Sequence, residues 1–173
     1  MHQLEVVSIR LVKDAPLMSE VPINNSVDAV KLLGEYLCEL DREVLCVINL
    51  NTANVPINCH FVSMGSLQES IAHPREILKS CILSNAAKIL LVHNHISGRL
   101  LPSIADCQLT DRMLQICDLI GIPLLDHIIV GGNNDSYFSF EEKGMLNFEP
   151  NRYKTNYEDI SFSKGITKKS KGR

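Results

Sequence analysis

Apolar and polar residues follow two different periods along this chain, and each period predicts its own kind of element. Apolar runs rich in Val, Ile and Leu, continuous or alternating with polar residues, are typical of strands. Apolar residues that recur every three or four positions are typical of helices. The predicted strands cover residues 4–13, 42–50, 55–64, 88–95, 122–132 and 136–140. The predicted helices cover residues 27–40, 73–85 and 103–121, and a closing helical turn covers 141–146.

Local signals mark the ends of these elements and their connections. Ser26, His73 and Ser103 are predicted to cap the three helices at their N-termini, and Gly121 is predicted to end the third helix. The turn at 51–54 joins the strands on either side of it as a hairpin. One hairpin and at least two strand–helix–strand units predict an α/β sandwich built on a mixed sheet.

Composition places the chain among globular proteins with a single domain. The sequence has 173 residues, of which 45% are hydrophobic and 21% charged. Its six cysteines form no C-x-x-C pair and lie mostly in apolar segments, so we expect reduced core residues. The apolar pattern fades near residue 149. We therefore predict one domain over residues 1–148 and a flexible basic tail over 149–173.

The net charge of −3 conceals an uneven distribution. Residues 151–173 hold seven Lys or Arg against two acidic residues, whereas the other 150 residues hold ten basic and eighteen acidic ones. Such a tail is suited to phosphates without sequence preference, although a solubilising end is the commoner meaning. No apolar run reaches the ~18–20 residues of a membrane span. Because the N-terminus also lacks signal-peptide features, the sequence predicts a cytoplasmic protein without membrane contact.

The segment KILLVHNH gives the main chemical signal, because an apolar strand ends there in two histidines. Side chains alternate along a strand, so His93 and His95 share a face. Asp106 follows in the first turn of the next helix, and a short loop can bring it back toward them. Two histidines and one carboxylate with a fourth position open are typical of catalytic zinc. The alternative for Asp106 is a helix cap, because Ser103 and Asp106 have capping-box spacing.

Hydrolysis at such a centre also needs a general base. Glu43 stands at the start of the strand predicted at 42–50, with Glu39 and Asp41 close to it in sequence. The residues alone do not choose among these three carboxylates. Without further information, a solvated strand end explains them better than catalysis does.

The pattern His93-x-His95-x7-Ser103-x2-Asp106 resembles the metal motif of the JAMM (MPN-plus) metallopeptidases. The wider match is closer to the RadC group of bacterial JAB-domain proteins and covers roughly residues 25–146. It is carried by REVLCVINLN (42–51), HPREILKSCILSNAAKILLVHNH (73–95), SG (97–98), PS (102–103), Asp106 and LLDHIIVG (124–131).

This resemblance implies a fold, an activity and a role for each site residue. The fold would be a mixed, curved sheet flanked by helices in three layers, related to the deaminase fold. His93, His95 and Asp106 would bind Zn²⁺. Glu43 would be the general base, and Ser103 would help to hold the oxyanion. The protein would then be a zinc-dependent hydrolase, or metalloprotease, that cleaves an amide or isopeptide bond in a peptide or protein substrate.

The loop after the histidines departs from the pattern of these relatives. Their usual HNHPSGDPTPS is HNHISGRLLPS in this chain, and the changed positions are Ile96, Arg99, Leu100 and Leu101. All five site residues remain, so we expect altered substrate preference rather than altered metal binding. Arg99 is expected to be solvated, with binding of a carboxylate as the alternative. His127, beside Asp126, is interpreted as a packed, hydrogen-bonded core histidine, with support of a metal ligand as the alternative.

A competing hypothesis is a non-catalytic module associated with nucleic acid, because the RadC name comes from a proposed role in DNA repair. Many relatives carry an N-terminal helix-hairpin-helix domain, and only about two dozen residues precede the first predicted helix in this chain. DNA contact would then fall to the tail segment KGITKKSKGR.

Overall fold

The computed structural model describes residues 11, 21–64, 72–132 and 136–147, which form three helices and five strands. The elements in chain order are α1 (Ser26–Cys38), β1 (Val44–Leu50), β2 (Pro56–Met64), α2 (Pro74–Leu83), β3 (Lys88–His95), α3 (Ile104–Ile120), β4 (Leu124–Gly131) and β5 (Tyr137–Ser139). All the predicted strands and helices between residues 27 and 140 are therefore present. The strand predicted at 4–13 lies almost entirely outside the described residues, and so does the tail at 149–173.

The strands form one mixed sheet in the order β2-β1-β3-β4-β5. Pairing is antiparallel between β1 and β2, between β1 and β3 and between β4 and β5, and it is parallel between β3 and β4. Helix α3 makes the crossover that a parallel pair requires. This order places β3 in the middle of the sheet, which explains why its side chains are apolar toward both faces.

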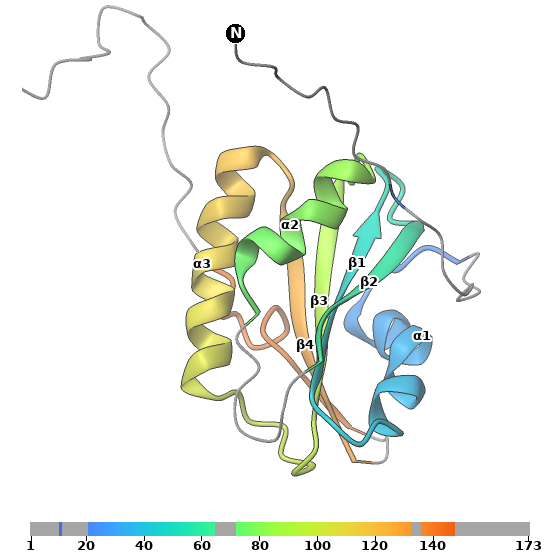
Figure 1. Cartoon of the computed structure of the whole chain (residues 1–173), viewed down its shortest axis with the longest axis vertical. Helices are drawn as coiled ribbons and strands as arrows, with labels where there is room; N and C mark the ends of the chain where they lie inside the picture. The colour runs from blue at the N-terminus through green and yellow to red at the C-terminus, as the bar shows by residue number, and fades with distance from the viewer. Residues whose placement is uncertain (1–10, 12–20, 65–71, 133–135, 148–173) are drawn as a thin grey trace, which may run out of the picture.

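Helices cover both faces of the sheet, so the fold has three layers (Figure 1). Helix α1 packs on one face, where Leu90 and Val92 of β3 belong to its core. Helices α2 and α3 pack on the other face over Ile89 and Leu91. The α/β class with a mixed sheet between helices is thus confirmed. The two histidines continue the alternation of the second face, which places them beside α3.

The cap of α1 differs from the prediction. Asn25 is the N-cap, and its side chain accepts a hydrogen bond from the amide of Asp28. Ser26, predicted to cap, is instead the first helical residue and is buried. Its hydroxyl donates to Asp126 Oδ2 in β4 at 3.0 Å. Asn25 and Ser26 are both good capping residues and are adjacent in sequence. Because the hydroxyl of Ser26 bonds to Asp126 in the sheet, Asn25 is the one that caps the helix.

The other predicted helix ends are confirmed. The His73 ring accepts from the amide of Arg75, and Ser103 accepts from the amide of Asp106. Gly121 ends α3 in the left-handed conformation, at φ 71°. These caps fix where α3 starts, and the start of α3 determines where Asp106 lies.

The helical turn predicted at 141–146 is wrong, because this segment forms successive turns instead. The amide of Gly144 bonds to the carbonyl of Glu141, and the amide of Met145 bonds to that of Phe140. Gly144 adopts φ +65°, which a helix does not allow and which glycine adopts easily. The positive φ of Gly144 therefore keeps this segment from continuing as a helix.

Hydrophobic residues of the described segments fill these two cores. No helix in the part of the chain that the structure describes is long and apolar enough to cross a membrane. The six cysteines are free, with Cys46, Cys81 and Cys117 buried and the other three half-buried. This agrees with the expectation that they act as small core residues.

Candidate metal centre

The two histidines and the aspartate meet at the end of β3. One side-chain atom from each of His93, His95 and Asp106 lies within 4.8 Å of the others. The histidines share a face because they are two residues apart on a strand. Asp106 reaches them because α3 begins just after the loop that leaves this strand end. The structure thus brings together the three residues that the sequence predicts as ligands.

The contacts within this group are short. The Nε2 atoms of His93 and His95 are 3.0 Å apart. Asp106 Oδ1 lies 3.3 Å from His93 Nε2, and Asp106 Oδ2 lies 3.4 Å from His95 Nε2. His93 is buried, whereas His95 and Asp106 are half-buried. The group is therefore largely screened from water, with His95 and Asp106 remaining partly exposed.

Hydrogen-bond directions show that this group fits a metal ion. The Nδ1 atom of His95 lies 2.7 Å from the carbonyl oxygen of Arg99, which can only accept, so Nδ1 carries the proton. In neutral His95 the lone pair is then on Nε2, which faces the Asp106 carboxylate. Lone pairs that converge in this way repel one another unless a cation lies among them. A divalent ion satisfies that requirement, and imidazole and carboxylate are common metal ligands.

Two of the three residues are in the protonation state that a metal ligand needs, whereas His95 holds a proton that a metal ion must displace. Burial lowers the pKa of His93 to about 4, although Asp106 opposes this effect. The hydrogen bond to Asp106 raises the pKa of His95. Burial acts to raise the pKa of Asp106, but its hydrogen bonds with His95 and Ser103 and the charge of His93 outweigh burial, and the pKa falls well below its usual range. Asp106 is therefore ionised and His93 neutral near pH 7, as ligands must be.

Asp106 is a helix cap and a member of the centre at the same time. Its Oδ2 accepts from the amide of Ser103 at 2.7 Å and from the hydroxyl of Ser103 at 2.6 Å. The amide of Asp106 donates in return to Ser103 Oγ at 3.1 Å, which completes a capping box. These bonds hold Oδ2 and leave Oδ1 directed at His93. The hydroxyl of Ser103, predicted to hold an oxyanion, is bonded to Asp106 in this arrangement.

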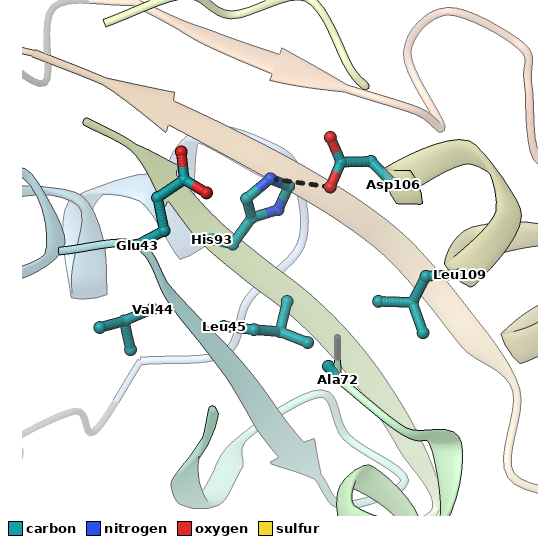
Figure 2. Close-up of a pocket in the computed structure, with 7 residues that line it drawn as sticks. All are labelled: Glu43, Val44, Leu45, Ala72, His93, Asp106 and Leu109. Carbon is teal, nitrogen blue, oxygen red and sulfur yellow. Dashed lines mark ion pairs between the residues drawn. The ribbon is translucent and has the colours of Figure 1, made fainter. Parts of the chain in front are cut away.

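Glu43 lies beside the centre, whereas Glu39 and Asp41, the two other candidates for the general base, do not line its pocket. It lines a pocket together with His93 and Asp106, and Figure 2 shows all three side chains around it. The pairing of β1 with β3 brings it there, because Leu45 is opposite His93. Asp41 instead forms an ion pair with Arg42. Glu39 is the exposed C-cap of α1 and is not among the residues that line the pocket.

Asn94 holds the backbone on both sides of Glu43, a contact that sequence reasoning missed. Its Oδ1 accepts from the amide of Val44 at 2.8 Å, and its Nδ2 donates to the carbonyl of Arg42 at 3.0 Å. Asn94 is buried and points to the opposite face of β3 from the two histidines. The only signal in the sequence was that Asn94 is a polar residue between two histidines, and this did not indicate a contact with the backbone around Glu43.

The floor of the pocket is apolar and its volume is about 40 Å³. That is room for a water molecule or two between Glu43 and the two residues of the cluster that line the pocket, His93 and Asp106. The remaining lining residues are Val44, Leu45, Ala72 and Leu109. An apolar floor strengthens the electrostatic interactions of the polar groups above it.

The changed loop and His127 also border the centre. Arg99 is exposed, as predicted, but its carbonyl is the acceptor for His95. His127 is fully buried and stacks on Phe140, with ring centroids 5.1 Å apart. Its interpretation as a packed, hydrogen-bonded histidine is confirmed. One of its hydrogen-bonding neighbours is His93, so it also touches a residue of the candidate centre.

Comparison with known proteins identifies the family. Among curated proteins, a UPF0758 protein of Rubrobacter xylanophilus is 44% identical over 124 residues, which cover 72% of this chain and 53% of the relative. A UPF0758 protein of Clostridium acetobutylicum is 45% identical over 126 residues, covering 73% and 54%. The chain thus spans about half the length of these curated relatives. The sequence model of the RadC-like JAB domain matches residues 23–145. The chain therefore belongs to the RadC-like JAB domain family.

Proposed function

We propose that this protein is a zinc-dependent hydrolase that cleaves an amide or isopeptide bond in a peptide or protein substrate. The observation that carries the proposal is the convergence of His93, His95 and Asp106 beside a pocket that Glu43 also lines. Membership of the RadC-like JAB domain family supports it. Zn²⁺ is preferred over Mg²⁺ or Ca²⁺ because two of the three ligands are imidazoles, whereas those ions prefer oxygen.

Each residue around the proposed metal centre has a distinct task. A zinc ion supplies Lewis acidity, which polarises a carbonyl and makes water a better acid. The carboxylate of Glu43 takes a proton from the attacking water and passes it to the leaving nitrogen. Leu45 and Leu109 keep bulk water from the pocket floor. Ser103 orients Asp106 through Oδ2.

A second task for Ser103 is donation to the developing oxyanion. Its exposed hydroxyl lies near the centre, which supports this role. The hydroxyl has only one proton, and that proton is donated to Asp106 Oδ2. The two tasks therefore compete, and catalysis through Ser103 requires the hydroxyl to turn away from Asp106.

The metal is tested first. Protein purified without added zinc is analysed for bound metals, next to His95→Ala prepared in the same way. We expect about one zinc per chain in the native protein and an affinity lower by orders of magnitude in the variant, which keeps only two protein ligands. Native protein that binds no metal, or a variant with unchanged content, contradicts the proposed centre.

The base is tested with Glu43→Gln, which keeps the size of the side chain and removes its basicity. Peptidase activity on a panel of linear and branched peptides is expected to fall by about 10²–10⁴-fold, with metal content unchanged. Asp41→Gln serves as the control, because Asp41 pairs with Arg42 away from the pocket, and it should stay active. Loss of zinc in Glu43→Gln would make Glu43 a ligand instead. Full activity with zinc retained would assign the base to another carboxylate.

A further inference from the structure

A chain of buried hydrogen bonds leads from helix α3 to the first histidine of the centre. The carbonyl of Asp106 accepts from Thr110 Oγ1 at 2.7 Å. Thr110 Oγ1 lies 2.6 Å from His127 Nδ1. His127 Nε2 lies 2.9 Å from His93 Nδ1. Since His93 Nε2 contacts the Asp106 carboxylate, the chain starts and ends at the same residue.

The carbonyl of Asp106, where the chain of hydrogen bonds begins, fixes which atom donates in each of the bonds that follow. A carbonyl oxygen only accepts, so the single hydroxyl proton of Thr110 points to Asp106. Thr110 Oγ1 must then accept from His127, which places a proton on Nδ1 of His127. Neutral His127 has its lone pair on Nε2 and accepts from His93, so His93 also carries its proton on Nδ1. The lone pair of His93 is therefore on Nε2, the atom that faces His95 and Asp106.

We propose that Thr110 and His127 are positioning residues that hold His93 in the tautomer able to bind a metal ion. This inference rests on the proposed metal centre. It extends that centre from the three ligands to one residue of α3 and one residue of β4. It also explains why a histidine stands inside the apolar strand β4 at position 127.

The surroundings keep the His127 ring in place. It is fully buried and stacks on Phe140, with an interplanar angle of 8°. Thr110 is also buried, one helical turn after Asp106 on the same side of α3. Burial away from water disfavours a second proton on the ring of His127. The helix that carries Asp106 therefore also sets the ligand atom of His93.

Thr110→Val tests the inference because it removes the hydroxyl and keeps the shape. Without an acceptor for Nδ1–H, the His127 tautomer with its proton on Nε2 becomes more favourable. His127 Nε2 then donates to His93 Nδ1, so the proton of neutral His93 moves to Nε2. Titration with Co²⁺ alone should show 10–100-fold weaker binding, the usual effect of losing a residue that supports a ligand. Thr110→Ser restores the hydroxyl and should bind within a few-fold of the native protein.

Cys117→Ala is the matched control. It shortens another buried side chain of α3 that packs away from the centre, so it should lower the unfolding temperature and leave Co²⁺ affinity unchanged. Unchanged affinity in Thr110→Val, or no recovery in Thr110→Ser, overturns the inference while leaving the metal centre intact. A native protein that binds no Co²⁺ or Zn²⁺ instead overturns the centre itself.

The tautomers give a second readout that does not depend on activity. Nitrogen-15 spectra of the imidazole rings in the metal-free native protein should show His93 and His127 protonated on Nδ1. In Thr110→Val both rings should shift toward Nε2 protonation, whereas in Cys117→Ala they should not. A native His127 with its proton on Nε2, or with two protons, contradicts the proposed direction of the bonds.

Discussion

In the proposed metal centre, His95 is the residue at which protons compete most directly with a metal ion. Its hydrogen bond with Asp106 raises its pKa above the ordinary value of ~6.5. In the metal-free protein, protonated His95 contributes stability that is fully present below about pH 6.5 and is lost as pH rises through the raised pKa. Metal binding has the opposite dependence, because the ion must displace that proton.

Metal affinity should therefore increase from about pH 6 to about pH 8, by up to ~10-fold per pH unit below the raised pKa. His93 adds little in this range, because burial keeps its pKa at about 4. Co²⁺ titrations at three pH values measure the dependence. An affinity that does not change with pH would mean that His95 carries no proton in the metal-free protein.

The cluster of His93, His95 and Asp106 was predictable because its sequence signals are local. His93 and His95 share a face through the two-residue period of a strand, and Asp106 follows from the capping signal of α3. The partners of these residues were not predictable. Contact of His127 with Thr110, and of Asn94 with the backbone around Glu43, depends on which strands and helices pack together. These contacts join residues far apart in sequence, and no local sequence pattern predicts them.

At the scale of elements, Gly131 of β4 allows the loop after β3 to lie close to the sheet. Gly131 is opposite His95 in the parallel pair. A Cβ atom at this position would lie 2.8 Å from the carbonyl oxygen of Gly98 and 2.8 Å from Leu100 Cδ2. The backbone oxygen cannot give way easily. The absence of a side chain at position 131 thus lets the loop bring the Arg99 carbonyl to His95.

Gly131→Ala should displace this loop and weaken the orientation of His95. We expect a loss of about 1–3 kcal/mol in the free energy of unfolding and ~10-fold or greater loss of metal affinity. Urea denaturation and Co²⁺ titration measure the two effects. Val130→Ala is the control, because Val130 faces α1 and should affect stability alone. Native affinity in Gly131→Ala would show that the loop adapts without moving Arg99.

Element types were largely predictable, whereas some of their ends and their neighbours were not. Periodicity identified the strands and helices of the described segments. The choice of Asn25 over Ser26 as a cap depended on Asp126, one hundred residues further along. The turn at 141–146 depended on the positive φ of Gly144. The strand order puts β1 beside β3 and therefore Glu43 beside His93. Predicting that order required knowledge of long-range strand pairing or the resemblance to known relatives.

At the scale of the whole molecule, the charge asymmetry suggests where any contact with nucleic acid occurs. Residues 151–173 carry a net charge of +5, against −8 for the rest of the chain. We propose that DNA binding, where it occurs, depends on this tail. Truncation after Phe148 should abolish it, and binding by the intact chain should fall steeply with salt. Fluorescence anisotropy with a duplex of mixed sequence measures both. Retained affinity in the truncated protein would point to a basic surface on the domain instead.

The capping box of α3 has a consequence for the choice of residue at position 106. Glutamate is preferred at the third helical position of a capping box, whereas the shorter aspartate of this chain places its carboxylate oxygen 3.3 Å from His93 Nε2. Aspartate at position 106 both starts the helix and reaches the histidines. Position 106 therefore serves the start of the helix and the proposed metal centre together. We expect a change to glutamate to favour the helix cap and to weaken the proposed metal centre, so that one methylene group separates helix stability from metal binding.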